Sequence, residues 1–451
     1  MDTPKKRKQF PLVATLIETF GFSPALASAV ALFLGFVCLL AVAWIVQSAP
    51  PRKLVMTSGP EGSSFQRWAA AYKEALAKHG VTLEVLPSSG SINNLDRMLT
   101  AGPNGEVVDI GFISGGIVAK DQKLDGLMSL GSVGYQPLLV YYRSPAPISR
   151  LSQLEGQRIA IGGVGSATRV IVQALLQANG ITGAPTVFND LDASAAADAL
   201  LKGDLDAVFL MGDSASMQTL RTLGRAPGIQ LFSFSQAEAY VRRNAFLNRI
   251  MLPQGSIDLG KNLPALDVVL VGPTVEFVAR EGLHSALSDL LLDVARKVHG
   301  KAGLLQKRGE FPAPLEHEFK LSDDAQSYYK TGRSWLYRSV GSFWVASLLN
   351  RLLLAVVPLA LVIIPAIRLL PVAYRFSIQL KFYRCYRPLQ RLERESFEPL
   401  TAERVQELLR QLDEIEKSVN RLKVPASFAE RFYGLRSYIH FVRIRLKGMA
   451  G

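Results

Sequence analysis

The sequence predicts an α/β domain of two lobes, flanked by two membrane-spanning helices and followed by a helical tail. Strand-like and helix-like stretches alternate through the central part of the chain, break off at Ser144 to Pro147 and then start again. Such alternation is typical of parallel α/β sheets. Uncharged apolar segments lie on both sides of this central part, and basic residues accompany each of them.

These patterns divide the chain into five predicted regions. They are a cytoplasmic N-terminal segment (1–25), a transmembrane helix (26–46), an extracytoplasmic domain (52–340), a second transmembrane helix (345–370) and a basic cytoplasmic tail (371–451). Within the domain, residues of about 52–145 and 250–335 are expected to form the first lobe, and residues of about 146–249 the second.

Charge is distributed unevenly along the 451 residues. The formal net charge is +13, of which residues 1–10 contribute +3 and residues 368–451 contribute +8. Both basic regions lie beside apolar segments, which is the positive-inside pattern of a membrane protein. A nucleic-acid-binding protein would instead carry its basic residues on a folded face, with aromatic side chains between them. We therefore expect contact with the lipid bilayer, no nucleic acid, and both termini in the cytoplasm.

The first apolar segment runs from Leu26 to Val46 without a charge. Its 21 residues are enough to cross a bilayer. A cleaved signal peptide is the alternative, because small residues such as Ser48 and Ala49 lie nearby. The apolar core of a signal peptide is usually shorter, so we favour a retained anchor. In both cases the sequence that follows is exported.

The two lobes are predicted from the order of their elements. The first lobe has expected strands at 53–57, 83–86 and 109–114, helices at 65–79 and 93–100, and two strands within 128–143. The second has expected strands at 158–162, 186–188, 207–211 and 229–234, and helices at 170–180 and 193–202. A strand at 267–278 and an amphipathic helix at 284–299 return to the first lobe. This order predicts a hinged protein with its ligand between the lobes.

Three turns rich in serine and glycine each connect a predicted strand to a predicted helix. They are Ser58–Ser64, Ser88–Asn94 and Gly162–Thr168. A turn of this kind leaves backbone N–H groups free at the N-terminus of the helix, where the helix dipole also favours an anion. Any α/β domain contains tight turns, but three of them in one domain favour an anion-binding cleft.

Three side chains near these turns have two interpretations each. Arg169 stands in the first turn of a helix, where a cation opposes the dipole. It therefore either faces an anionic ligand or is exposed or paired within the fold. Phe65 and Tyr135 can stack on a ligand or pack in the core, and the core is the commoner place for aromatic residues near strand ends.

Catalytic and metal-binding patterns are missing from the sequence. GxxxxGK[ST], HExxH and GxSxG do not occur, the five histidines are scattered, and Cys38 and Cys385 lie in separate regions. Gly163–Thr168 is similar to a dinucleotide fingerprint with Asp190 downstream, but a threonine replaces the third glycine. We expect binding without catalysis, with no catalytic residues, no cofactor and no metal.

The second apolar segment leads into the tail. Leu352–Ile367 is uncharged and lies between Arg351 and Arg368. Arg351 is expected to extend towards the outer interface of the membrane. An aromatic belt would lie beside it there, formed by Trp335, Tyr337, Phe343 and Trp344. Beyond it, apolar residues recur at heptad-like spacing in 405–422 and 428–446, with a capping box at Ser427 and Glu430. The tail is predicted to be an antiparallel helical hairpin, and a homodimer through it stays open.

The sequence also resembles a known family. The segments TSGPEGSSF, LPSSGSINNL, VDIGFIS, IAIGGVGSATRVIVQALLQANGI, LLKGDLDAVFL and LPALDVVLVGPTVEFVAREGLHSAL occur in this order. Together they resemble the TAXI family of TRAP-transporter solute-binding proteins over about Lys53 to Arg351, and the tail resembles a membrane-tethered subset of it. The resemblance implies a type II periplasmic-binding-protein fold at the bacterial inner membrane. It also implies capture of a small organic anion, such as an amino acid or a carboxylate, for the membrane subunits of a TRAP transporter.

The resemblance also implies which residues contact the ligand. In the first lobe these are Ser63, Ser64, Phe65, Ser89, Gly90 and Ser91, and in the second lobe Gly165, Ser166, Ala167 and Thr168, to which we add Arg169 from its position. Two departures affect the ligand: Glu61 places an acidic group in the first turn, and Gly115-Gly116 replaces a residue that is often acidic or polar.

A function of another class competes with the receptor. A transmembrane sensor or assembly protein would explain the second span and the tail, because a freely diffusing capture protein needs neither. In that case binding outside the membrane would act on the cytoplasmic hairpin. An enzyme is the third possibility and would require catalytic turnover.

Overall fold

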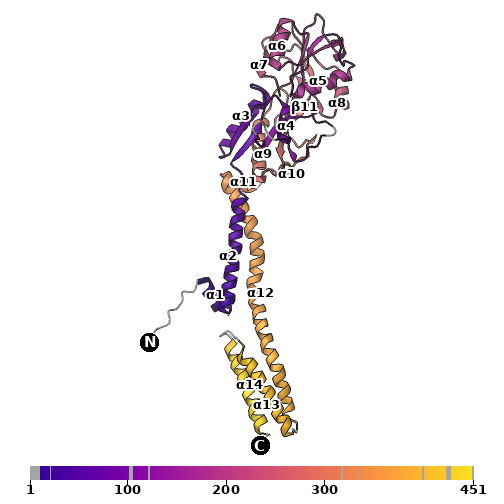
Figure 1. Ribbon diagram of the computed structural model, residues 1–451. Coiled ribbons are helices and arrows are strands. Elements are labelled where there is room, and N and C mark those ends of the chain that lie inside the picture. Colours follow the sequence, from indigo (N-terminus) through magenta and orange to yellow (C-terminus); the bar gives the residue numbers. More distant parts are fainter. Residues whose placement is uncertain are drawn as a thin grey trace. The chain divides into compact units, whose positions relative to one another are not determined.

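The computed structural model describes residues 11–20, 22–100, 105–119, 122–315, 318–333, 335–398, 401–422 and 428–448 (Figure 1). The chain divides into two compact units. One is residues Pro50–Ser347, here the α/β unit, and the other combines Met1–Ala49 with Leu348–Gly451, here the helical unit. Each unit is described by itself.

The first lobe of the α/β unit is built on a six-stranded sheet with the order β10-β11-β3-β1-β2, and β4 also pairs with β11. Its strands are β1 (Lys53–Thr57), β2 (Thr82–Leu86), β3 (Ile110–Ser114), β4 (Leu127–Tyr135), β10 (Leu247–Leu252) and β11 (Val268–Arg280). β1 is parallel to β2 and β3, as predicted, but β11 runs antiparallel to β3, β4 and β10. The sheet is therefore mixed, because a loop, not a crossover helix, connects β10 to β11.

The second lobe is built on a five-stranded sheet with the order β7-β6-β8-β5-β9. Its strands are β5 (Leu139–Tyr142), β6 (Arg158–Ala160), β7 (Val187–Asn189), β8 (Ala207–Leu210) and β9 (Gln230–Leu231). β6 is parallel to β7 and β8, whereas β5 is antiparallel to β8 and β9.

The boundaries between the lobes differ from the predicted ones. β5 belongs to the second sheet, so the chain leaves the first lobe between Tyr135 and Leu139, not at residue 145. It returns before Leu247, where β10 joins the first sheet. The prolines after Ser144 only end β5. Gln136 and Pro137 separate the two strands within 128–143, but the sequence did not show that these strands belong to different sheets.

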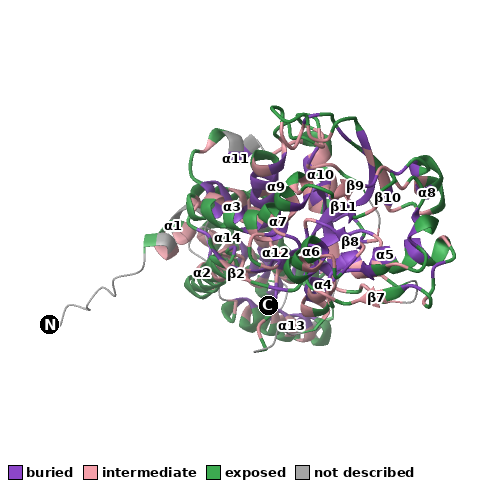
Figure 2. Cartoon of the chain, turned by 90° about the horizontal axis from the view of Figure 1, so that it is seen from above, coloured by how far each residue is buried: buried purple, intermediate pink, exposed green. Residues whose placement is uncertain are grey.

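Helices cover both sheets. In the first lobe they are α3 (Ser64–Ala77), α4 (Ser91–Leu99), α9 (Ser285–His299), α10 (Asp323–Thr331) and α11 (Trp335–Ser339). The residues between the two crossings form a short 3-10 helix (Leu151–Leu154), α5 (Ala167–Ala178), α6 (Ala193–Lys202), α7 (Met217–Arg225) and α8 (Ala237–Arg243). Figure 2 shows strands β8 and β11 buried among helices whose outer faces are exposed. The sequence did not predict α7, α8 or β10.

Two long apolar helices run side by side in the helical unit, after the short α1 (Pro11–Phe20). They are α2 (Pro24–Gln47) and the first part of α12 (Phe343–Glu395). The Ser23 N–H donates to the Tyr374 hydroxyl at one end, and the Arg351 guanidinium donates to the Ile45 carbonyl at the other. The two helices are therefore antiparallel.

Two stretches are long and apolar enough to cross a membrane. They are Pro24–Gln47 and Phe343–Ala366, with mean hydropathies of 2.8 and 2.3. The Arg351 guanidinium donates to a carbonyl in the last turn of α2. That turn carries carbonyls without helical partners and the negative end of the helix dipole, and both favour a cation.

The tail is a bundle of three helices. α12 continues without interruption over 53 residues to Glu395, and α13 (Ala402–Asn420) and α14 (Ala429–Gly448) pack against its second half. The buried heptad residues are Val405, Leu408, Leu412, Val419, Leu435, Ile439, Val442 and Leu446. The predicted two-helix hairpin lacked the α12 strip of Ile378, Phe382, Leu389 and Leu392, which completes this core. Ser427 of the predicted capping box lies outside the described residues.

Candidate functional site

The N-termini of α3, α4 and α5 come together where the two lobes meet. The hydroxyls of Ser63 and Ser166 cap α3 and α5 by accepting from the N–H groups of Gln66 and Arg169. Gly90 precedes α4 with φ of 133°, a conformation that glycine adopts without strain. The three turns singled out in the sequence are therefore adjacent in space, and we call this region the junction.

Most of the predicted contact residues are buried at the junction. Those with little or no exposure are Ser63, Ser64, Phe65, Gly90, Ser91, Ser166, Ala167 and Thr168, whereas Gly165 and Arg169 are half-buried and Ser89 is exposed. Burial of so many polar groups requires hydrogen-bond partners, because an unpaired buried N–H costs roughly 1–3 kcal/mol. The partners found in this structure belong to the protein itself.

Backbone carbonyls of the second lobe accept hydrogen bonds from helix N-termini of the first lobe. The Gly165 carbonyl accepts from the N–H groups of Ile92 and Asn93 at 3.1 and 3.3 Å. The Gly212 carbonyl accepts from the Ser64 N–H at 2.8 Å and from the Ser64 hydroxyl at 2.7 Å. The lobes are therefore in direct contact through groups that were expected to hold a ligand.

Asp213 contributes a carboxylate to the same junction. It follows β8 in the second lobe and has no exposed surface. Its Oδ2 accepts from the Ala167 N–H at 3.1 Å and its Oδ1 from the Ser214 hydroxyl at 3.0 Å, and the Thr168 hydroxyl also donates to Oδ1. Burial raises the pKa of the Asp213 carboxyl, while these hydrogen bonds oppose the increase. The sequence analysis missed Asp213, although an acid directly after a predicted strand is a signal for this position.

Close backbone approach makes the junction possible. A Cβ atom on Gly90 would lie 3.1 Å from the Ser166 Cα and 3.2 Å from the Asp213 Oδ2. A Cβ atom on Gly165, whose φ is +86°, would lie 2.3 Å from the Ser89 hydroxyl oxygen. Side chains at these two positions would push the lobes apart.

The residues with two interpretations each contact other groups of the protein. The Arg169 guanidinium forms an ion pair with Asp190 at 2.6 Å. The Phe65 ring is buried against Trp68 and Phe112. The Tyr135 hydroxyl donates to Glu310.

The two departures from the family pattern also have positions in the structure. Glu61 is exposed, so its charge lies outside the buried junction. Glu318, from late in the chain, places a carboxylate beside the glycine pair after β3 and accepts from the Gly116 N–H at 2.8 Å. Burial raises the pKa of the Glu318 carboxyl. An acidic group is therefore present at that point, supplied by another segment.

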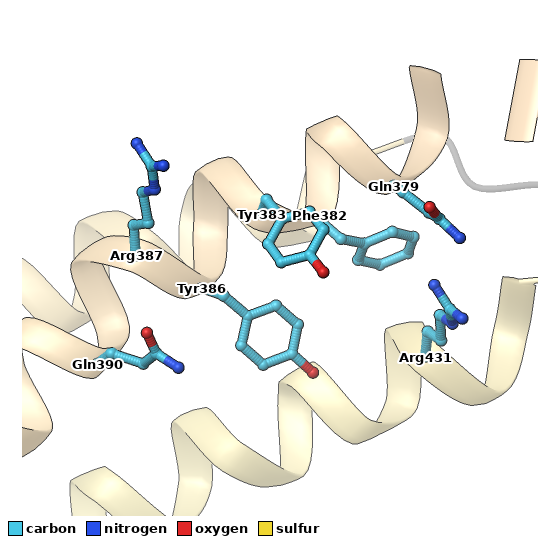
Figure 3. Close-up of a pocket in the computed structure, with 7 residues that line it drawn as sticks. All are labelled: Gln379, Phe382, Tyr383, Tyr386, Arg387, Gln390 and Arg431. Atoms are coloured by element: carbon cyan, nitrogen blue, oxygen red, sulfur yellow. The ribbon is translucent and has the colours of Figure 1, made fainter. Parts of the chain in front are cut away.

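A second concave site lies in the helical unit, between α12 and α14 (Figure 3). It is a cavity of about 360 Å³. Its lining residues are Gln379, Phe382, Tyr383, Tyr386, Arg387, Gln390 and Arg431. In Figure 3 the Phe382 and Tyr386 rings lie between the two helices, and Arg431 extends from α14 towards α12. Among the residues that the structure describes, no group of three or more His, Cys, Asp or Glu side chains could hold a metal ion.

Comparison with known proteins points to one family for the middle of the chain. Residues 65–265 match the model of the NMT1-like family. This range contains the junction residues from Phe65 to Asp213 in both lobes.

Solved structures of binding proteins are also similar to this chain. The periplasmic aliphatic sulphonate binding protein SsuA from Escherichia coli is 13% identical, with a TM-score of 0.36, over 55% of this chain and 73% of that one. A periplasmic binding protein from Brucella ovis with glutathione bound is 16% identical, with a TM-score of 0.34, over 58% of this chain and 70% of that one. A histidine kinase sensor domain with similarity to periplasmic binding proteins is 16% identical, with a TM-score of 0.32, over 55% of this chain and 90% of that one.

Proposed function

We propose that residues 52–340 form an extracytoplasmic solute receptor that binds a small organic anion, such as an amino acid or a carboxylate. One observation carries this proposal: the N-termini of α3, α4 and α5 meet between two lobes that the chain crosses twice. Helix N-termini present N–H donors and a positive dipole, which suit a carboxylate. The match of residues 65–265 to the NMT1-like family supports it, because that range carries two of the three turns completely.

The binding step would require the lobes to open. An anion can reach the N–H groups of Ser64, Ile92 and Asn93 only when the carbonyl acceptors of the second lobe move away from them. The lobes would then close on the solute, with the solute replacing those acceptors. Two chain crossings between lobes are the arrangement on which hinged closure depends.

The helical unit would hold the receptor at the membrane. Pro24–Gln47 and Phe343–Ala366 would be the two spans, with both termini in the cytoplasm, where the basic tail would meet anionic lipid. The partner would be the membrane subunits of a TRAP-type transporter, as the family resemblance implies. A tethered receptor would deliver its solute without diffusing away.

The test is the thermal unfolding of the full chain in lipid nanodiscs against amino acids, dicarboxylates and sulfonates. A solute at ~100 times its Kd should stabilise the domain by roughly 2.7 kcal/mol. Ala167→Pro should abolish this shift, because it deletes the N–H at the first position of α5, where proline is tolerated and Ser166 already has the extended conformation that proline requires.

The matched control is Ala193→Pro at the first position of α6, after the extended Asp192. It makes the same substitution in the same lobe outside the junction, so the solute shift should survive. If no compound shifts the unfolding of folded, ligand-free protein, the receptor proposal is wrong.

A transmembrane sensor is the second candidate, favoured by the continuity of α12. Phe343 and Ala346 at its start are buried in the core of the first lobe, and its last turns are buried in the three-helix bundle. Crosslinking in cells separates the candidates: a receptor should capture multi-spanning transporter subunits, and a sensor should capture cytoplasmic proteins through residues 401–447.

A further inference from the structure

Arginine and aromatic side chains surround the cavity between α12 and α14 (Figure 3). None of its described lining residues is acidic. We propose that this cavity binds a mononucleotide, with the phosphate held by arginine and the base stacked on tyrosine. The cavity belongs to the helical unit and shares no residue with the junction, so nucleotide binding would be a second activity, separate from solute capture.

One face of α12 forms most of the cavity. Six of the seven lining residues come from α12, and their spacing of i, i+3, i+4, i+7, i+8 and i+11 places them on one side of the helix. Phe382 is 5% exposed and belongs to the apolar core of the bundle, so this wall is fixed by packing. The volume of about 360 Å³ lies within the range of small-molecule sites, roughly 300–1,000 Å³.

The charge around the cavity favours an anion. Arg387 and Arg431 are exposed, and neither is among the ion-paired residues in the described part of the bundle. The ion pairs found there join Glu395 to Arg404, Glu407 to Arg410, and Asp413 and Glu416 to Arg443. Residues 375–394 of α12 contain six Lys or Arg and one Glu. An anion near the cavity therefore meets a positive field.

A phosphate suits this field better than a carboxylate does. A guanidinium group donates two parallel hydrogen bonds to phosphate oxygens, and the opposite charges strengthen both. A phosphate monoester carries a charge of about −1.5 to −2 at pH 7, so it gains more from a positive field than a singly charged carboxylate does. In Figure 3 Arg431 extends from α14 towards the rings of α12, which places a phosphate bound to it beside those rings.

The aromatic residues supply the second part of the site. Tyr383 is 64% exposed, and Tyr386 is half-buried with its ring 6.1 Å from the Tyr438 ring between centroids. Accessible ring faces stack on nucleobases, and this stacking tolerates different bases because every base has a π-face. The amides of Gln379 and Gln390 add donors and acceptors for the edge of a base. A lipid headgroup offers a phosphate but no ring, so it would leave these residues unused.

Nucleotide binding can be measured without any solute. The experiment uses the full chain in nanodiscs of zwitterionic lipid and equilibrium dialysis of the 5′-monophosphates of adenosine, guanosine, cytidine and uridine. Each should bind saturably, with Kd values within about 10-fold of one another because stacking tolerates different bases. Adenosine and inorganic phosphate should each bind at least ~10-fold more weakly than adenosine monophosphate, since each lacks one of the two sets of contacts.

Two substitutions separate the phosphate from the base, and each has a matched control. Arg431→Gln should weaken the binding of adenosine monophosphate roughly 10-fold to 100-fold, the range for hydrogen bonds to a charged group. Tyr383→Leu should weaken it roughly 10-fold through the lost stacking. Arg436→Gln and Tyr433→Leu make the same changes at exposed positions outside the lining and should leave binding unchanged. Circular dichroism confirms that each variant keeps its helices.

Three results would overturn the proposal. They are the absence of saturable binding with a Kd below ~1 mM for all four monophosphates, inorganic phosphate binding as tightly as adenosine monophosphate, and equal losses in Arg431→Gln and Arg436→Gln. Nanodiscs that contain phosphatidylglycerol form a further arm. If this lipid binds through Arg431 and no nucleotide binds, the cavity is a lipid-headgroup site and the proposal is rejected. None of these outcomes bears on solute binding at the junction, so the proposed function is tested separately.

Discussion

The junction and the aromatic core of the first lobe bury a titratable side chain in opposite ways. Asp213 at the junction has three hydrogen-bond donors around its carboxylate, the Ala167 N–H and the hydroxyls of Thr168 and Ser214. His299 lies in a core of aromatic rings, 4.9 Å from Trp68 and 5.8 Å from Tyr72 between ring centroids. Within the described part of the chain, its Nε2 has no hydrogen-bond partner.

The difference shows which protonation state each region selects. Burial alone lowers the pKa of His299 to about 3, because nothing in the core stabilises the imidazolium. Burial raises the pKa of Asp213, but hydrogen bonds to the charged form oppose that effect. The core therefore selects a neutral ring, whereas hydrogen-bond donors at the junction offset part of the cost of burying the Asp213 charge. Stability should depend on packing and pH in the core, and on donor geometry at the junction.

The largest effect should come from the centre of the aromatic core. The Phe112 ring has no exposed surface and lies 5.4–5.6 Å from the rings of Phe65, Trp68, Tyr72 and Phe277. Phe112→Ala should cost about 3–5 kcal/mol through lost burial and the cavity it leaves. Hydrogen exchange of peptides from α3 and α9 measures the loss. A cost below ~1 kcal/mol would mean that the core collapses around the cavity.

Acidification should weaken the core through His299. The folded-state pKa of about 3 lies below the ordinary value of 6.5, so the unfolded chain binds more protons between these values. The free energy of unfolding therefore falls as the pH drops below ~6.5, by about 2 kcal/mol at pH 5. His299→Phe should remove this dependence while keeping the ring.

Comparing the parent protein with His299→Phe isolates the contribution of His299 to the pH dependence of stability. Burial raises the pKa of Asp289 to about 6, which works in the opposite direction because acid relieves the cost of burying its charge. That contribution is common to both proteins and cancels in the difference. Unfolding measured at pH 7 and pH 5 should give curves that separate only at the lower pH. If the free energies of unfolding of the two proteins differ by the same amount at pH 7 and pH 5, the His299 ring binds a proton in the folded state as readily as in the unfolded chain.

The junction should respond to backbone geometry instead. Gly90→Ala combines a φ of +133° with contacts of 3.1–3.3 Å to the opposite lobe, for a cost of roughly 1–3 kcal/mol and a longer distance between the lobes. Gly180→Ala is the control, since Gly180 has a φ of +81° and no atom within 4 Å of an added Cβ. Gly180→Ala should lower the free energy of unfolding because of its positive φ, and it should leave the distance between the lobes unchanged, as pulsed electron paramagnetic resonance between spin labels on α3 and α6 measures it. Equal lobe distances in both variants would contradict the close fit at the junction.

The sequence predicted local order better than mutual arrangement. Strands and helices such as β1 and α6 begin and end where hydrophobic periodicity and capping residues place them. The turns around Ser63 and Gly90 are neighbours because the parallel strands β1 and β2 bring their carboxyl ends to one edge of the first sheet, and the turn around Ser166 meets them from the second sheet. The occupant of that edge was not predictable. Asp213 is distant in sequence from Ala167, and only the folded chain shows that its carboxylate accepts from that N–H.

Arg169 should give the smallest effect and the sharpest comparison between ligand and structural roles. Its guanidinium is paired with the half-exposed Asp190, so solvent screens the pair, and Arg169→Ala should cost less than ~1 kcal/mol. The solute shift should persist, because the junction donors are the N–H groups of Ser91 and Ala167. Thermal unfolding with and without solute measures both quantities. If the substitution leaves stability intact but abolishes the shift, Arg169 leaves Asp190 when solute binds, and the second lobe adds a cation to the amides.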